Sequence, residues 1–168
     1  MKKKKLFRCQ RGASAVEFAI VLPLLLVFVF GIIEFGILLY DKAIITNASR
    51  EGARVAIRAY WADTDSDGKG DTPALYPVGE VENVAENYAA TRLIKFSGAT
   101  PIATVTESTV DGIDYRTVNV VYGHSFLLFP NVLGTLLGVN STTMPGAISL
   151  NASSTMRMEV QDLTLPCP

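Results

Sequence analysis

The longest apolar stretch of the chain covers residues 18–33, and after the single charge of Glu34 it continues to Tyr40. The 23 residues from 18 to 40 exceed the length of about 20 that a helix needs to cross a bilayer. A helix of a soluble domain normally keeps a polar face, and this stretch has none. The pattern therefore predicts a transmembrane helix over residues 18–40.

Beyond Tyr40 the apolar positions recur every three or four residues, as they do on one face of a helix. These positions are Ile44, Ile45, Ala48, Gly52, Val55, Ala56 and Ala59. Polar and charged residues fill most of the positions between them. We therefore expect one helix over residues 13–59, of which the second part stands outside the bilayer because the whole is too long to fit within it.

The following residues, 60–168, have the pattern of a small domain on the far side of the membrane. Residues 61–77 are rich in Asp, Gly and Pro, a composition that predicts a loop. Apolar positions at helical spacing then predict a second helix over residues 79–96.

From residue 102 the spacing of the apolar positions changes to two, which is typical of strands. The expected strands cover residues 102–107, 115–122 and 147–160, with Asp111 and Gly112 as a turn between the first two. We expect the third strand to pair antiparallel with the second. The predicted fold class is therefore α+β, with a long N-terminal transmembrane helix, a second helix and a three-stranded antiparallel sheet.

The charges of the chain are divided unevenly about the apolar stretch. Residues 1–12 hold six basic and no acidic residues, whereas residues 13–168 hold nine basic and 16 acidic ones, a net charge of −7. The positive-inside rule places the N-terminus in the cytoplasm and the domain outside it. A secretory signal peptide has similar parts, but this apolar stretch is too long and no small-x-small cleavage site follows it. The acidic domain argues against nucleic acid as a partner.

Glu17 lies at the head of the apolar stretch, five residues after Gly12. A carboxylate in a membrane helix is unfavourable, so its default interpretation is functional. The basic leader, Gly12 and Glu17 together resemble the class III signal of type IV pilins, which a prepilin peptidase cuts after the glycine. The resemblance implies that residues 1–12 are a leader, that cleavage falls between Gly12 and Ala13, and that Glu17 and Phe18 serve assembly. Glu17 would then pair with the new amino group of a neighbouring subunit.

Three pieces of sequence between Gly12 and Arg54 resemble the TadE-like family, the minor pseudopilins of the Tad (Flp, tight adherence) pilus system. They are Gly-Ala-Ser-Ala-Val-Glu-Phe-Ala-Ile-Val-Leu-Pro, Gly-Ile-Ile-Glu-Phe-Gly and Asn-Ala-Ser-Arg-Glu-Gly-Ala-Arg. The resemblance implies a part in assembling a pilus or export apparatus in the bacterial inner membrane. The implied partners are a prepilin peptidase, other Tad pilins and pseudopilins, an inner-membrane assembly platform and the lipid bilayer.

The loop of residues 63–71 has the chemistry of a calcium site. Its carboxylates stand at alternate positions with a glycine at the sixth, as in an EF-hand loop. The expected ligands are Asp63, Asp65, Asp67, the backbone carbonyl of Lys69, and Asp71 through water. Ala74 stands where an EF-hand has its bidentate glutamate, so the expected affinity is weak. The alternative is a solvated acidic loop without a metal.

The residues that could carry catalysis are few. His124 is the only histidine, and although Ser125 follows it, the chain has no Gly-x-Ser-x-Gly motif. We therefore expect His124 to be a structural residue and the protein not to be an enzyme.

Cys9 and Cys167 are expected on opposite sides of the bilayer, so they cannot pair within one chain. The alternative function is a single-pass membrane-anchored binding module, either calcium-dependent or not.

Overall fold

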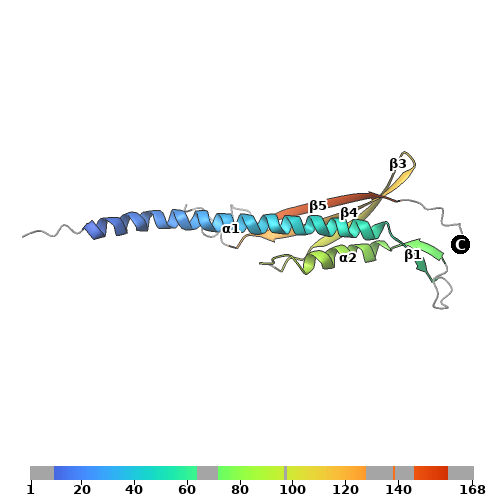
Figure 1. The fold of residues 1–168 in the computed structure, drawn as a ribbon, viewed down its shortest axis with the longest axis horizontal. Helices are drawn as coiled ribbons and strands as arrows, with labels where there is room; N and C mark the ends of the chain where they lie inside the picture. Colours follow the sequence, from blue (N-terminus) through green and yellow to red (C-terminus); the bar gives the residue numbers. More distant parts are fainter. Residues whose placement is uncertain (1–9, 64–71, 97, 128–137, 139–145, 159–168) are drawn as a thin grey trace, which may run out of the picture. The chain divides into compact units, whose positions relative to one another are not determined.

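A computed structural model describes residues 10–63, 72–96, 98–127, 138 and 146–158. Its elements follow the order α1 (Gln10–Ala56), β1 (Ala59–Ala62), β2 (Thr72–Leu75), α2 (Val78–Ala90), β3 (Ile102–Val110), β4 (Ile113–Ser125) and β5 (Ala147–Arg157) (Figure 1). The chain divides into one unit of residues 1–36 and 126–145 and a second unit of residues 37–125 and 146–168. This architecture confirms the predicted α+β class.

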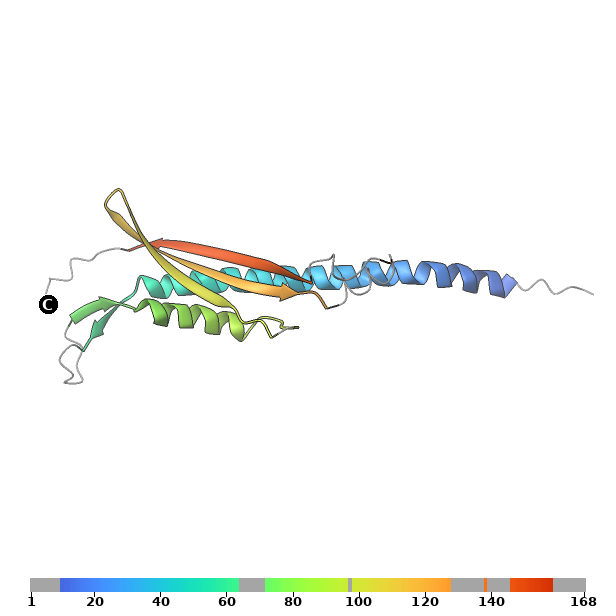
Figure 2. The same ribbon diagram turned by 180° about the vertical axis from the view of Figure 1, so that it is seen from behind.

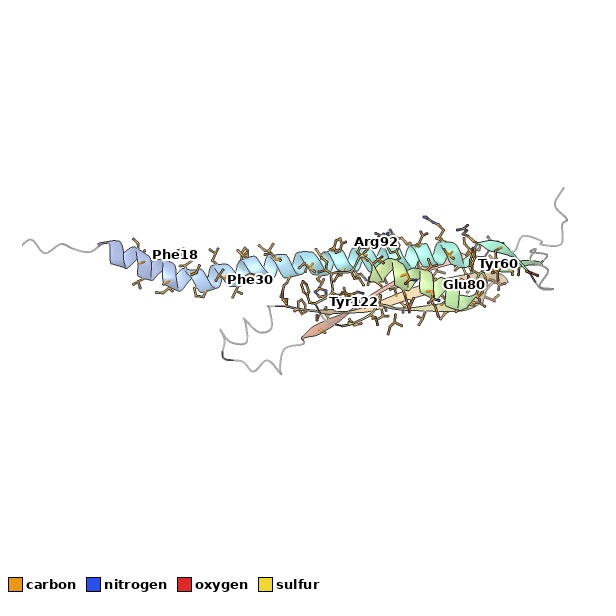
Figure 3. The ribbon with its side chains drawn as sticks, turned by 90° about the horizontal axis from the view of Figure 1, so that it is seen from below. Phe18, Phe30, Tyr60, Glu80, Arg92 and Tyr122 are labelled. Atoms are coloured by element: carbon orange, nitrogen blue, oxygen red, sulfur yellow. The ribbon has the colours of Figure 1, made fainter. Side chains whose placement is uncertain are left out.

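The described part of the first unit is mainly the N-terminal portion of α1. Most of its large apolar side chains are exposed, as Phe18 illustrates in Figure 3, whereas Phe30 is partly buried. The segment contains a window that is long and apolar enough to cross a membrane and of which no part is buried. So many exposed apolar side chains along one helix are unfavourable in water and favourable in lipid. By length and composition this segment is thus the candidate membrane span that the pattern predicts.

In the second unit, α2 runs alongside the C-terminal part of α1 (Figures 1 and 2). Gly52 permits the close packing there, because an added Cβ would lie 3.0 Å from both the Cβ of Ala85 and the Cγ1 of Val118. The most deeply buried apolar residues in the core of this unit are Ile45, Ala48, Ala53, Ala56, Val81, Ala85, Ala89, Val118, Val120 and Tyr122. They come from α1, α2 and the sheet, so all three layers share one core.

The three-stranded sheet has the order β3-β4-β5 and is antiparallel throughout. Along β4 the residues at even positions from Arg116 to His124 are buried, whereas those between them are partly exposed. Asp111 and Gly112 connect β3 to β4 with φ angles of 53° and 76°. Both central residues of the turn therefore have positive φ, as in the type I′ turns that favour this dipeptide. The predicted turn and the antiparallel pairing of the last two strands are confirmed.

The prediction of a loop over residues 61–77 was wrong at both of its ends. β1 and β2 form a two-stranded antiparallel sheet in which Tyr60 lies opposite Ala74. The rings of Tyr60 and Tyr76 lie 5.0 Å apart between centroids, a contact that joins the two ends of this hairpin. Pro73 is tolerated in β2 because a two-stranded sheet consists only of edge strands.

The second helix is shorter than the predicted range of residues 79–96. α2 ends at Ala90, and Thr91 turns its hydroxyl back to the carbonyl oxygen of Asn87 at 2.9 Å. Beyond this point the backbone N–H of Ile94 donates to Asp41 on α1 instead of continuing the helical ladder. The apolar spacing of the sequence continues past Ala90, but this tertiary hydrogen bond draws the chain out of the helix.

Candidate functional site

The predicted processing and assembly residues all lie near the start of α1. Because the helix begins at Gln10, Gly12, Ala13, Glu17 and Phe18 are all within it. Glu17 is exposed, and the Phe18 side chain is 61% exposed. Positions 13 and 17 are one helical turn apart, so both lie on the same face of the helix. The structure therefore leaves the carboxylate and the following aromatic ring accessible to another molecule.

A buried polar cluster lies where α1 emerges from the apolar segment. Asp41 directly follows Tyr40 and is completely buried, and His124 on β4 is 2% exposed. The Nδ1 atom of His124 lies 2.8 Å from Oδ2 of Asp41, and the other carboxylate oxygen accepts the N–H of Ile94 at 3.1 Å. Asp41 thereby joins three separate parts of the second unit.

Tyr122 completes this cluster on the same face of β4. Its hydroxyl donates to the carbonyl oxygen of Ile94 at 3.5 Å. Burial raises the pKa of the Tyr122 hydroxyl above its usual 10.0, and the negative charge of Asp41 raises it further. Both effects disfavour the tyrosinate, so the cluster is built around a neutral phenol and a carboxylate.

The closed surroundings of His124 favour the structural role that we expected from the sequence. An imidazole that is 2% exposed cannot reach a substrate in solution without opening of the core. The hydroxyl of the neighbouring Ser125 is buried and makes no hydrogen bond among the described residues. The side chains of this cluster connect α1, β4 and the segment that follows α2.

Arg116 forms the corresponding polar centre at the other end of the unit. Its Nη1 donates to the carbonyl oxygens of Ala56, at 2.8 Å, and Tyr76, at 2.9 Å. Its Nε donates to Oε1 of Glu107 at 2.9 Å, and Nη2 lies 2.7 Å from the same oxygen. A guanidinium at the C-terminal end of α1 satisfies carbonyl groups that the helix leaves unpaired and is favoured by the helix dipole.

Two glutamates of α2 protect the outer edge of the sheet. The N–H of Val105 donates to Oε1 of Glu82 at 3.1 Å, and the N–H of Ala103 donates to Oε1 of Glu86 at 2.9 Å. Two residues that are four positions apart on a helix lie about as far from each other as two residues that are two positions apart on a strand. Both hydrogen bonds can therefore form at the same time. These two N–H groups of the edge strand are therefore not available for pairing with another chain.

The predicted calcium loop falls largely outside the described residues. Asp63 is described and exposed, whereas Asp65, Asp67, Lys69 and Asp71 are not among the described positions. Among the part of the chain that the structure describes, no three His, Cys, Asp or Glu residues are grouped so that they could hold a metal. The calcium site stays a prediction.

Sequence reasoning missed the residues that hold the second unit together. Asp41 had no local signal, because its partners His124 and Ile94 lie 83 and 53 positions away. For Glu82 and Glu86 the signal in the sequence was their spacing of four, which places both side chains on one face of a helix. Arg116 had none, because its partners Ala56 and Tyr76 lie 60 and 40 positions away.

The comparisons with known proteins bear on the N-terminal part of the chain. Residues 12–54 match the family model of the TadE-like protein. This match confirms the resemblance predicted from the sequence and covers the whole segment from Gly12 through the apolar stretch to Arg54. No curated protein and no solved structure matches the chain.

Proposed function

From the match of residues 12–54 to the TadE-like family model, we propose that this protein is a minor pseudopilin of a Tad-type pilus or export apparatus. The observation that carries the proposal is the position of the match. It begins at Gly12, includes Glu17 and the apolar stretch, and ends at Arg54, shortly before α1 ends at Ala56. The matched segment therefore coincides with the proposed cleavage site and the anchor helix.

In this proposal a prepilin peptidase removes residues 1–12 on the cytoplasmic side of the inner membrane. Cleavage between Gly12 and Ala13 creates an amino group, and this cation pairs with the Glu17 carboxylate of another subunit. A lone carboxylate at the head of a lipid-embedded helix is unfavourable, and pairing offsets much of the penalty. The exposed Glu17 and Phe18 are compatible with contacts to a neighbouring helix. The partners would be other Tad pilins and pseudopilins and an inner-membrane assembly platform.

Intact-mass spectrometry after co-expression with the cognate peptidase tests the processing step. We expect a mature chain that begins at Ala13, and we expect Gly12→Val to abolish the cut. Gly36→Ala is the matched control, because an added Cβ at Gly36 meets no atom within 4 Å. A functional protein that retains Met1 would contradict the proposal.

The assembly step needs a separate test in the native host. Glu17→Ala should leave membrane insertion and cleavage intact and strongly reduce piliation, because the new amino group loses its partner. Glu51→Ala, which removes a partly exposed carboxylate outside the proposed span, is the control. Normal piliation in the Glu17→Ala strain would exclude the pairing role.

The orientation is tested with a reporter fused after Pro168. The positive-inside rule predicts reporter activity only outside the cytoplasm, since the basic residues precede the span. A reporter that is active in the cytoplasm would overturn the proposed topology.

A further inference from the structure

We propose that residues 92–96, together with Lys42, form a surface that lies on the lipid headgroup layer where α1 leaves the membrane. The inference rests on the proposed membrane span and adds a second point of contact between the domain and the bilayer. We call residues 92–96, which are Arg92, Leu93, Ile94, Lys95 and Phe96, the return segment.

The first observation is the level at which the return segment lies. The Tyr40 hydroxyl, at the end of the apolar stretch, donates to the carbonyl oxygen of Arg92 at 3.2 Å. Asp41, the next residue, accepts the N–H of Ile94 at 3.1 Å. Both hydrogen bonds join residues of the second unit. This unit begins at Ile37 and so includes the last turn of the apolar stretch, residues 37–40. The chain therefore returns along α2 to the position at which α1 would emerge from lipid.

The second observation is the exposure of apolar side chains in this segment. Ile94 is 39% exposed and Phe96 is 41% exposed, although Leu93 between Arg92 and Ile94 is buried in the core. Tyr40 is itself 46% exposed beside them. Aromatic and aliphatic side chains next to a span are favoured at the membrane interface, where tyrosine in particular is enriched.

The third observation is the sign of the charge at this end of the unit. Lys42, Arg92 and Lys95 are exposed, whereas the neighbouring Asp41 is buried against His124. The nearest glutamate on α2, Glu86, is partly buried and accepts the N–H of Ala103. The exposed charges near Tyr40 are thus basic, and they match the phosphate groups of phospholipids.

At the opposite end of the unit the exposed charges are of both signs, since Arg54, Arg58 and Arg157 lie there together with acidic side chains. Figure 3 shows Arg92 and Tyr122 toward one end and Tyr60 and Glu80 toward the other. Glu80 lies in the first turn of α2, and Glu107, Asp111 and Asp114 lie in the distal part of the β3–β4 hairpin. Exposed charges of a single sign at the membrane exit, beside the apolar Ile94 and Phe96, match the anionic groups of a lipid surface.

The contacts of Arg92 and Lys42 leave both cations available to phosphate. The Arg92 guanidinium stacks on the Tyr88 ring at 3.9 Å, and one of its nitrogens donates to the Tyr88 carbonyl oxygen. The ammonium group of Lys42 donates to the carbonyl oxygen of Asn151 on β5. Each cation has further N–H donors, and both side chains are exposed. Ile94 and Phe96 would enter the interface between these cations, as in interfacial amphipathic segments.

Site-directed spin labelling of the full chain in lipid nanodiscs measures the depth of this surface. In a Cys9→Ser, Cys167→Ser background, labels are placed at Phe96→Cys, at Phe28→Cys in the middle of the span, and at Ser108→Cys on the distal part of β3. We expect the label at 96 to be accessible to both oxygen and a water-soluble nickel chelate, between the lipid-like values at 28 and the aqueous values at 108. An aqueous result at 96 with a lipid-like result at 28 would overturn this inference alone. An aqueous result at 28 would instead remove the membrane span on which it rests.

A charge-reversal variant tests whether the basic residues recognise lipid phosphate or whether the return segment only lies near the bilayer. Lys95→Glu should shift the label at 96 toward the aqueous values, and the shift should be larger in discs with phosphatidylglycerol than in phosphatidylcholine alone. Arg58→Glu is the matched control, because Arg58 is also exposed but lies after the end of α1 at Ala56. Equal accessibility at 96 in the Lys95→Glu variant and the parent, in both lipids, would contradict the role of the basic residues.

Discussion

Asp41 and His124 are 83 positions apart in the sequence, yet the Oδ2 and Nδ1 atoms of their side chains lie 2.8 Å apart in the core. The carboxylate also holds the N–H of Ile94, so one side chain determines where α1, β4 and the end of α2 meet. This arrangement lies directly after the last apolar residue of the proposed span. It ties the fold of the domain to the point at which the helix leaves the membrane.

Replacing Asp41 by Asn should destabilise the domain because the buried imidazole loses an ionised partner. Hydrogen bonds to charged groups contribute about 1.5–3 kcal/mol each, so we expect a loss of about 2–3 kcal/mol in the free energy of unfolding. Chemical unfolding of the full chain in detergent, followed by near-UV circular dichroism, measures the change. Glu51→Gln is the control, since Glu51 makes only an exposed pair with Arg54 at 3.4 Å. Unchanged stability of Asp41→Asn would show that the cluster does not support the fold.

The raised pKa of Tyr122 predicts a loss of stability at alkaline pH. The folded state holds the phenol proton more tightly than the unfolded chain, so the contribution of Tyr122 is fully present below the unfolded pKa of about 10. It is lost as the pH rises through the higher folded pKa. Tyr122→Phe should therefore flatten the decrease in unfolding free energy above about pH 10. Tyr115→Phe, a change on the opposite face of β4, is the control for the loss of a tyrosine hydroxyl, and an unchanged slope in Tyr122→Phe would contradict the prediction.

Local features of the sequence predicted the long helix, the apolar stretch and the Asp111-Gly112 turn, because each depends on residues close in the chain. The end of α2 could not be predicted in this way. The apolar spacing continues past Ala90, and what stops the helix is a bond from Ile94 to Asp41, which lies 53 positions earlier. β1 and β2 were missed because their strands have only 4 residues each and are joined by a loop-like composition.

For the candidate site, the processing residues Gly12, Ala13 and Glu17 could be proposed because their spacing is a local motif, and their role stays a prediction. The stabilising roles of the buried polar side chains could not be predicted, since they depend on partners that only the fold brings together. Arg116 occupies an ordinary alternating position on its strand, and no feature near it in the sequence points to Ala56 or Tyr76.

Replacing Arg116 should weaken the end of the domain that lies away from the proposed membrane exit. Arg116→Lys keeps the charge but cannot make the forked contacts to two carbonyl oxygens and Glu107 at once. The carbonyl oxygens of Ala56 and Tyr76 would lose their donor, and we expect a loss of about 2–3 kcal/mol in unfolding free energy. Glu107→Gln is the control, and because the Glu107 side chain is 53% exposed it should have the smaller effect. If the control destabilised the protein as much as Arg116→Lys, the ion pair would be the main interaction and the contacts to the helix end would matter less.

Glu82 and Glu86 of α2, which accept N–H groups from the edge of β3, lead to a prediction about self-association. Glu82→Ala with Glu86→Ala would release the N–H groups of Val105 and Ala103, which point away from β4 at an outer edge of the sheet. Free N–H groups on an edge strand are a template for pairing with another chain, so the double variant should self-associate. Sedimentation of the full chain in detergent measures this, and the expected result is a concentration-dependent increase in mass.

The pair Glu82→Gln and Glu86→Gln is the matched control, because the amide oxygen still accepts a hydrogen bond while the charge is removed. Association of the alanine variant but not the glutamine variant would assign the protection to hydrogen bonding, whereas association of both would assign it to charge repulsion. If both remained monodisperse at the highest concentrations, these carboxylates would not be what keeps the edge of β3 from pairing.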